Sequence, residues 1–258
     1  MDLTVLGVHS HPDDIEFVMA GTMFLLGQRG CELHYMNIAN GCYGSAEYSK
    51  DEIIRIRRDE SIAATKVLGA THHESIADDM GVFYTEEMIR RMAAVVREVQ
   101  PDIVLTASPQ DYMEDHMNAC RIALGGTFVR AMSNYDSIPL QPTTEKDVTI
   151  YHAMPHGLVD GLRNRIVPDF FVNVGSVIDR KGEMLACHRS QKDWLDRTQG
   201  MGSYVDTMKE MTAQTGAISD VYRYAEGWRR HLHIGYSRTE QTPLEDVLGD
   251  LITKKRGN

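Results

Sequence analysis

The residues with the clearest chemical potential stand in two polar segments. "HSHPDD" at 9–14 places two histidines and two aspartates after an apolar run, and "SPQDYMEDH" at 108–116 ends in a histidine preceded by three acidic residues. Imidazole nitrogens and carboxylate oxygens are usual protein ligands of zinc, and a catalytic zinc site commonly combines three such ligands with a water molecule. The two segments therefore contain the residue types that a hydrolytic metal site needs.

The spacing within these segments suggests a ligand set. His11 and Asp14 stand about one turn apart, so both can point into one site, and His116 can supply a third ligand. Asp13 would then lie near the bound water and accept its proton as the water attacks a carbonyl carbon. A structural interpretation competes with this one: the two aspartates cap the helix that follows, while His11 forms a hydrogen bond within the loop.

Alternating strand-like and helix-like segments would bring the two polar segments together. Apolar runs at 3–8 and 102–107 precede them. Strand–helix alternation predicts a parallel sheet, in which ligand sites lie beyond the carboxyl ends of the strands. We expect one α/β domain over 1–258, with a Rossmann-like, mostly parallel sheet flanked by helices. The other expected strands are 32–39, 71–77, 147–154 and 169–174, and the expected helices are 15–29, 51–68, 85–99, one ending near 132, and 175–190.

The C-terminal portion, residues 198–258, has the least regular pattern. Between 198 and 224 the chain is rich in Met, Gly, Thr and Tyr, a composition compatible with helices that carry a lid or an oligomer contact. No internal repeat and no break in composition divides the chain, so we expect no second domain.

Composition narrows the class of protein. The net charge of −10 over 258 residues argues against nucleic acid or an anionic membrane as the main partner. Four dispersed cysteines without a CxxC pair indicate reduced thiols rather than disulfides. The N-terminal segment does not read as a secretory leader, and no apolar stretch is long enough to span a bilayer. We expect a cytoplasmic protein that acts on a small molecule.

Four segments carry a resemblance to a known family. "HSHPDDIEF" resembles the "AHPDDE" signature of the PIG-L or LmbE-like N-acetylglucosaminyl deacetylases, and "SPQDYMEDHMNACRIA" resembles their second motif, a loop that usually ends in "HPDH". "RIRRDESIAATKVLGA" and "VIDRKGEMLACHRSQ" are similar to two further helical motifs of the family. The resemblance runs from about residue 3 to about residue 233, which is most of the chain.

The resemblance implies a function and a set of roles. His11, Asp14 and His116 would bind zinc, with Fe²⁺ as the alternative ion, and Asp13 would be the general base. Arg57 would contact a substrate hydroxyl, Arg58 being the weaker candidate because the register across "RIRR" is open. The implied reaction removes an N-acetyl group from an amino sugar or an N-acetylglucosamine conjugate. Members of the family often assemble into trimers or hexamers, so a homo-oligomer is expected.

One position departs from the family pattern. The first histidine of "HPDH" usually stabilises the oxyanion or protonates the leaving amine, and Met113, which cannot donate a proton, stands there. Asp115 matches the motif aspartate and could orient a neighbour. His233 is our preferred replacement for the missing acid, in a catalytic set with Asp13 and Asp115. The other late candidates are His188 and His231.

Three further histidines have expected positions, and two other functions are compatible with the motifs. His152 and His156 follow an expected strand and would line the pocket, whereas His9 is expected to support a ligand or fill the core. The departure at Met113 leaves room for a binding protein that keeps the metal and sugar pocket but does not hydrolyse. Two histidines and a carboxylate are also the ligand set of non-haem iron oxygenases. No GxSxG motif occurs, which argues against a serine nucleophile.

Overall fold

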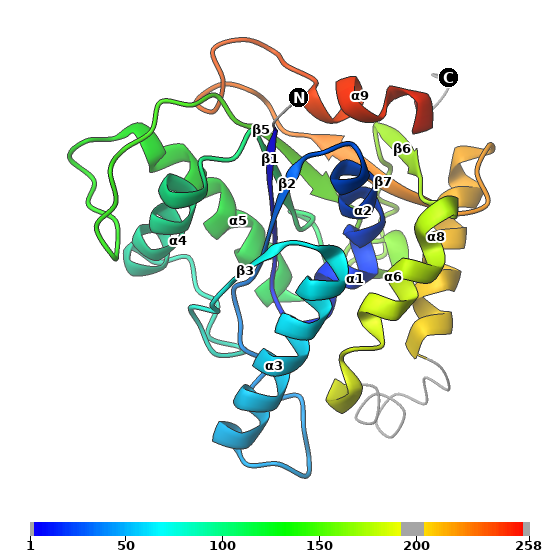
Figure 1. The fold of residues 1–258 in the computed structure, drawn as a ribbon, viewed down its shortest axis with the longest axis horizontal. Helices are drawn as coiled ribbons and strands as arrows, with labels where there is room; N and C mark the ends of the chain where they lie inside the picture. Colours follow the sequence, from blue (N-terminus) through cyan, green and yellow to red (C-terminus); the bar gives the residue numbers. More distant parts are fainter. Residues whose placement is uncertain (1–2, 192–203, 255–258) are drawn as a thin grey trace.

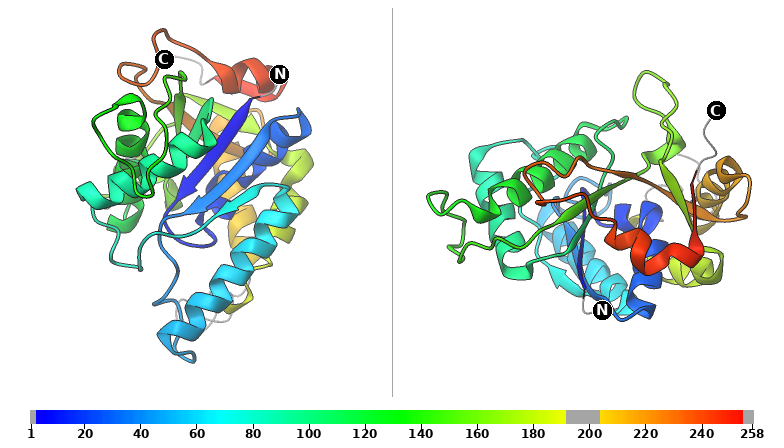
Figure 2. Two further views of the ribbon diagram at one scale, coloured as in Figure 1. Left: turned by 60° about the vertical axis from the view of Figure 1, so that its left-hand side comes forward. Right: turned by 90° about the horizontal axis from the view of Figure 1, so that it is seen from above.

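The computed structural model describes residues 3–191 and 204–254 of the chain. One eight-stranded sheet runs through these residues in the order β3-β2-β1-β4-β5-β7-β6-β8 (Figures 1 and 2). The strands from β3 to β5 are parallel, whereas β7, β6 and β8 continue the sheet with antiparallel pairing. The strands are β1 Thr4–His9, β2 Glu32–Asn37, β3 Thr71–His73, β4 Ile103–Thr106, β5 Thr149–Ala153, β6 Phe170–Asn173, β7 Ala225–Arg230 and β8 Ile252–Lys254.

Helices cover both faces of the sheet (Figure 1). One face carries α4 (Glu86–Val99) and α5 (Glu114–Phe128), which pack against each other. The other face carries α2 (Ala20–Gln28), α6 (Ile178–Leu185) and α8 (Tyr204–Ser219). The remaining helices are α1 Asp14–Val18, α3 Lys50–Leu68 and α9 Pro243–Leu248, with short 3₁₀ turns at Val129–Ala131, His156–Leu158, Gly175–Val177 and Gly249–Leu251.

The central strand β1 is apolar on both sides because both faces of the sheet are covered. Val5 belongs to the core beneath α2 and α6, whereas Leu6 and Val8 belong to the core beneath α4 and α5. All three side chains are fully buried. Successive side chains of a strand point to opposite faces, so a strand between two helical layers needs apolar residues at nearly every position. The expected α/β fold with a mostly parallel sheet and flanking helices is confirmed.

The expected helix at 15–29 is wrong in one respect, since it is broken at Met19 into α1 and α2. The break is stabilised from across the sheet. Glu226 on β7 accepts hydrogen bonds from the backbone N–H groups of Gly21 and Thr22, 2.9 and 2.7 Å long, at the start of α2. Lys181 on α6 pairs with the same carboxylate, and both side chains are buried. A contact over about 200 positions of sequence leaves no local pattern.

The expectation of an irregular portion at 198–258 is wrong for the part that the structure describes. Residues 204–254 contain α8, β7, α9 and β8. Strand β7 was not predicted, because its sequence, "AEGWRR", lacks the alternation or apolar run that indicates a strand. Residues 198–203 and 255–258 lie outside the described residues. None of the described helices combines the length and the apolar character that crossing a membrane requires.

Candidate functional site

The loop between β1 and α1 holds Asp13 in a conformation that few residues adopt. Asp13 occupies the N-cap position of α1 with φ at 108°, and its side chain forms no capping hydrogen bond. A non-glycine residue with positive φ costs about 1–3 kcal/mol and is typical of functional sites. The capping interpretation therefore fails for Asp13, whose carboxylate is directed into the pocket instead.

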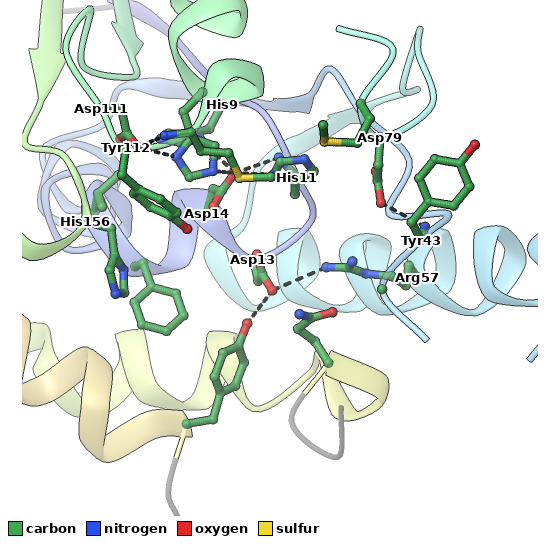
Figure 3. Close-up of a pocket in the computed structure, with 18 residues that line it drawn as sticks. His9, His11, Asp13, Asp14, Tyr43, Arg57, Asp79, Asp111, Tyr112 and His156 are labelled. Atoms are coloured by element: carbon green, nitrogen blue, oxygen red, sulfur yellow. Dashed lines mark hydrogen bonds and ion pairs between the residues drawn. The ribbon is translucent and has the colours of Figure 1, made fainter. Parts of the chain in front are cut away.

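Three imidazoles surround the carboxylate of Asp14 (Figure 3). The distances to Asp14 Oδ2 are 2.8 Å from His9 Nδ1, 3.3 Å from His11 Nδ1 and 3.4 Å from His116 Nε2. His9 ends β1, His11 lies in the following loop, and His116 is in the first turn of α5. The two polar segments thus meet at the carboxyl edge of the parallel strands, as expected.

The donor set of this cluster fits a divalent metal ion. His9, Asp14 and His116 have ligand atoms that all lie within 4.8 Å of one another, and His11 approaches the same carboxylate. Two ligand atoms of a tetrahedral zinc site lie about 3.3 Å apart, given metal–ligand distances of about 2.0–2.1 Å. The separations of His11 and His116 from Asp14 match that spacing, whereas the 2.8 Å separation of His9 is that of a hydrogen bond.

Charge in the cluster is concentrated on Asp14. Burial acts to raise the pKa of Asp14, but His116 and His9 outweigh it and hold the pKa well below its usual range. Burial acts to lower the pKa of His11, and hydrogen bonds to Asp115 and Asp14 reverse this and raise it to about 10. The site therefore keeps an ionised carboxylate in a poorly hydrated place and draws positive charge to it.

Further carboxylates orient the imidazoles. His116 Nδ1 lies 3.1 Å from Asp111 Oδ1, which leaves Nε2 directed at Asp14. His11 Nε2 lies 3.1 Å from Asp115 Oδ2, and that oxygen also accepts a hydrogen bond of 2.7 Å from the Met80 backbone. Such partners fix the ring orientation and the tautomer of a metal-binding histidine. Asp115 thus contacts His11, in keeping with an orienting role.

Asp13 is held separately, by two groups from other elements. Arg57 Nη2 lies 3.3 Å from Asp13 Oδ2, and the Tyr204 hydroxyl of α8 donates a hydrogen bond to the same oxygen. Burial raises the pKa of Asp13, against the opposing effect of the Arg57 guanidinium. Tyr204 was not predicted as a site residue, because a tyrosine in a Met-rich segment carries no signal of its own.

The two arginines of "RIRR" have different surroundings. Arg57 is buried beneath the turn at Gly41, where an added Cβ would come within 2.5–2.8 Å of its side chain. Gly41 also has φ at +79°, so glycine suits this position on both counts. Arg58 is exposed and pairs with Glu74 on the surface. The structure therefore places Arg57 in the site and Arg58 outside it.

The histidines from the C-terminal half that were considered as the catalytic acid lie outside the pocket, where such an acid would have to be. His233 lines a separate small cavity together with His231, and its Nδ1 lies 3.6 Å from Glu240. His188 is fully buried against Glu16, at 2.9 Å. His152 contacts His231 and the backbone of Ala107 instead of the pocket. The prediction that His233 supplies the acid therefore has no support from the geometry, because His233 is not among the residues that line the pocket.

The pocket over Asp13 and Asp14 has a volume of about 320 Å³. Its described wall contains four aspartates and one arginine, Arg57, which Asp13 already engages. Tyr43, Met80 and Tyr112 form an apolar rim and are 58, 61 and 60% exposed. Met113 and His156 also line the cavity, as expected for His156. An acidic floor beneath an aromatic rim suits a neutral polar ligand with apolar faces.

Comparisons with known proteins agree on the fold and diverge on the reaction. Residues 6–125 match the family model "PIG-L: GlcNAc-PI de-N-acetylase". The chain is 26% identical over 194 residues to a diacetylchitobiose deacetylase of Thermococcus kodakarensis, covering 72% of this chain and 69% of the relative. It is also 26% identical over 200 residues to a 4-oxalmesaconate hydratase of Pseudomonas putida, covering 73% of this chain and 74% of the relative.

A solved structure extends the likeness to nearly the whole chain. The crystal structure of a 4-carboxy-2-hydroxymuconate hydratase from Pseudomonas putida superposes with a TM-score of 0.74 and 22% identity. It covers 94% of this chain and 99% of its own. At this level of identity the match concerns the fold, which therefore includes the antiparallel strands beyond residue 125.

Proposed function

We propose that this protein is a metal-dependent N-deacetylase, because residues 6–125 match the PIG-L family model. Its substrate would be an amino sugar or an N-acetylglucosamine conjugate, and its products acetate and a free amine. The observation that carries the proposal is the separation of two carboxylates in one pocket. Asp14 is surrounded by imidazoles, whereas Asp13 is held apart by Arg57 and Tyr204. One carboxylate is suited to bind a metal ion and the other to accept a proton.

The ligands in this proposal are His11, Asp14 and His116, and the ion is zinc, with Fe²⁺ as the alternative. The separations of His11 and His116 from Asp14 support this set, although the ligand atoms that all lie within 4.8 Å of one another are those of His9, Asp14 and His116. His9 would instead hold the Asp14 carboxylate in place through the 2.8 Å contact of its Nδ1. When bound, such an ion lowers the pKa of a coordinated water and polarises the amide carbonyl.

Asp13 is the proposed general base. It removes a proton from the attacking water as the new C–O bond forms, and the later break of the C–N bond releases the amine. A raised pKa makes a carboxylate a stronger base, so burial of Asp13 favours this role. Arg57 and Tyr204 fix the carboxylate in direction, and the buried position of Arg57 makes its main role the support of Asp13 and not a first contact with substrate.

Hydration of a double bond is the second candidate. The hydratase of Pseudomonas putida is as similar in sequence as the deacetylase of Thermococcus kodakarensis, and Met113 removes one acid of the deacetylase motif. The family model that matches residues 6–125 names a de-N-acetylase, which favours the deacetylase over this second candidate.

The test uses zinc-loaded protein and two sets of compounds. Release of acetate is measured with N-acetylglucosamine, N,N'-diacetylchitobiose and an N-acetylglucosaminyl conjugate, and loss of the conjugated double bond is followed with 4-oxalmesaconate. The proposal expects acetate release with at least one acetamide. Turnover of 4-oxalmesaconate alone would favour the second candidate, and bound metal without either reaction would favour a binding protein. A homo-oligomer and a cytoplasmic location remain predictions, to be measured by light scattering and by fractionation.

A further inference from the structure

A continuous series of ring contacts runs along one side of the pocket and has His156 at its middle; Figure 3 labels Tyr112 and His156 of this series. His116 packs on Tyr112 with ring centroids 5.6 Å apart, and Tyr112 packs on His156 at 6.1 Å. His156 packs on Phe17 at 5.8 Å, and Phe17 packs on Tyr204 at 5.1 Å. The hydroxyl of Tyr204 in turn donates a hydrogen bond to Asp13. His156 is therefore linked by ring contacts to His116 of the cluster on one side and to Tyr204, the partner of Asp13, on the other, and it lines the same cavity.

His156 differs from the other pocket histidines in its partners. His9, His11 and His116 each contact Asp14, so their ring nitrogens are engaged within the cluster. Among the described residues, His156 has no carboxylate partner and no hydrogen-bonded partner. Its contacts are with the ring faces of Phe17 and Tyr112. Its nitrogens are thus available to a molecule that enters the cavity.

The position of His156 follows from the topology. It begins the 3₁₀ turn His156–Leu158, three residues after the end of β5, which runs parallel to β4. The carboxyl ends of β1, β4 and β5 meet at one edge of the sheet. A side chain that follows β5 is therefore brought beside the segments that follow β1 and β4.

We propose that His156 donates the proton to the leaving amine, in place of the acid that Met113 cannot supply. This inference rests on the proposed deacetylase function. The imidazolium N–H of His156 gives its proton to the amide nitrogen as the C–N bond breaks, and the electron pair of that bond stays on nitrogen. The acyl group leaves as acetic acid, which keeps the second proton of the attacking water and ionises in solvent. Asp13 then gives its proton to solvent and the free imidazole takes one up, which restores both groups. His156 is exposed at the cavity, and the neighbouring groups still remove enough water from its ring to lower its pKa, so its protonated form is a stronger acid than an ordinary imidazolium.

The experiment compares His156→Gln with His233→Gln, a matched change in a histidine outside the pocket. Both variants are loaded with zinc, and their metal content is measured first. Each is then assayed with an N-acetyl sugar, whose amine must be protonated to leave, and with 4-nitrophenyl acetate, whose phenolate leaves without a proton. A proton donor contributes about 10²–10⁴-fold to such a step. We expect His156→Gln to lower kcat on the acetamide by about 100-fold or more and to leave the ester rate within about threefold.

The outcomes separate this inference from the function on which it rests. An equal loss on both substrates, or no loss on either, would overturn the role of His156 while leaving the deacetylase intact. Free imidazole added to His156→Gly offers a second measurement, and it should restore part of the acetamide rate but not raise the ester rate in proportion. Wild-type protein that releases no acetate from any acetamide would remove the proposed function, and the role of His156 with it.

Discussion

The hydroxyl of Tyr204 donates a hydrogen bond to Asp13 across 191 positions of sequence. Tyr204 is fully buried in the first turn of α8, and Asp13 lies between β1 and α1. The base is therefore oriented by a helix from the C-terminal part of the chain, which packs against β7 and α6. A carboxylate held from two sides loses little orientational freedom when a substrate binds.

Tyr204→Phe should separate orientation of the base from binding of the substrate. The change removes one hydrogen bond to Asp13 but keeps the ring that packs on Phe17. We expect kcat for acetamide hydrolysis to fall about 10- to 100-fold, with KM nearly unchanged, because one oriented hydrogen bond to a charged group contributes about 1.5–3 kcal/mol. Steady-state kinetics check this, with Tyr48→Phe as the control. A KM effect without a kcat effect would place Tyr204 against the substrate instead.

The proposed ligand set predicts which histidine variants lose zinc and which one keeps it. His11→Gln and His116→Gln should each lose zinc after gel filtration in buffer with a weak chelator, because each removes a proposed ligand. His9→Gln should keep zinc bound near one ion per chain, because His9 stands at hydrogen-bond distance from Asp14. Elemental analysis of the three variants measures this directly. Loss of metal from His9→Gln, with retention by His11→Gln, would make His9 the metal ligand and His11 the residue that supports Asp14.

The buried pair of Lys181 and Glu226 predicts a large effect on stability. Lys181→Met would leave Glu226 without its cation in a place that water does not reach. Breaking a buried ion pair in this way costs about 3–5 kcal/mol of the free energy of unfolding. Lys209→Met is the control, since Lys209 pairs with Asp179 at the surface, where such pairs contribute about 0–1 kcal/mol. Similar denaturation midpoints for the two variants would argue against this account of the α1–α2 break.

The burial of His152 predicts that the folded protein loses stability in acid. Burial lowers its pKa from 6.5 to about 4, although a hydrogen bond to Ala107 opposes the change. The folded protein therefore binds this proton less readily than the unfolded chain, so the stabilising contribution is complete above pH 6.5 and is lost as the pH falls towards 4. The loss is on the order of 3 kcal/mol. Urea unfolding at several pH values gives the free energy of unfolding as a function of pH. This free energy should depend less steeply on pH for His152→Gln than for the wild type, and an unchanged dependence would contradict the role of His152.

Local patterns were sufficient for the elements that position the ligands. Apolar runs before "HSHPDD" and "SPQDYMEDH" predicted parallel strands, and parallel strands bring the following segments to one edge. His11, Asp14 and His116 do meet there, around one carboxylate. The place of His9 in the cluster could have been anticipated, since His9 ends the same strand.

Long-range contacts account for what the sequence analysis missed. Tyr204 reaches Asp13, and Glu226 reaches the start of α2, over distances in sequence that no local pattern records. The preference for His233 has no support from the geometry, and the antiparallel direction of β7 beside β5, which explains this, has no local signal in the sequence. β7 pairs with β5 in the antiparallel direction, so residues after its end, His233 among them, lie away from the edge that carries the pocket.

The central claim is that a metal ion and Asp13 together hydrolyse an acetamide, and one reconstitution tests it most directly. Acetate release from N,N'-diacetylchitobiose is measured for the protein as purified, after removal of metal with a chelator, and after addition of zinc, with Asp13→Asn treated in parallel. We expect activity to vanish with the metal and return with zinc in the wild type, and Asp13→Asn to bind zinc yet stay at least about 100-fold slower. Full turnover by the stripped protein, or by zinc-loaded Asp13→Asn, would contradict the account.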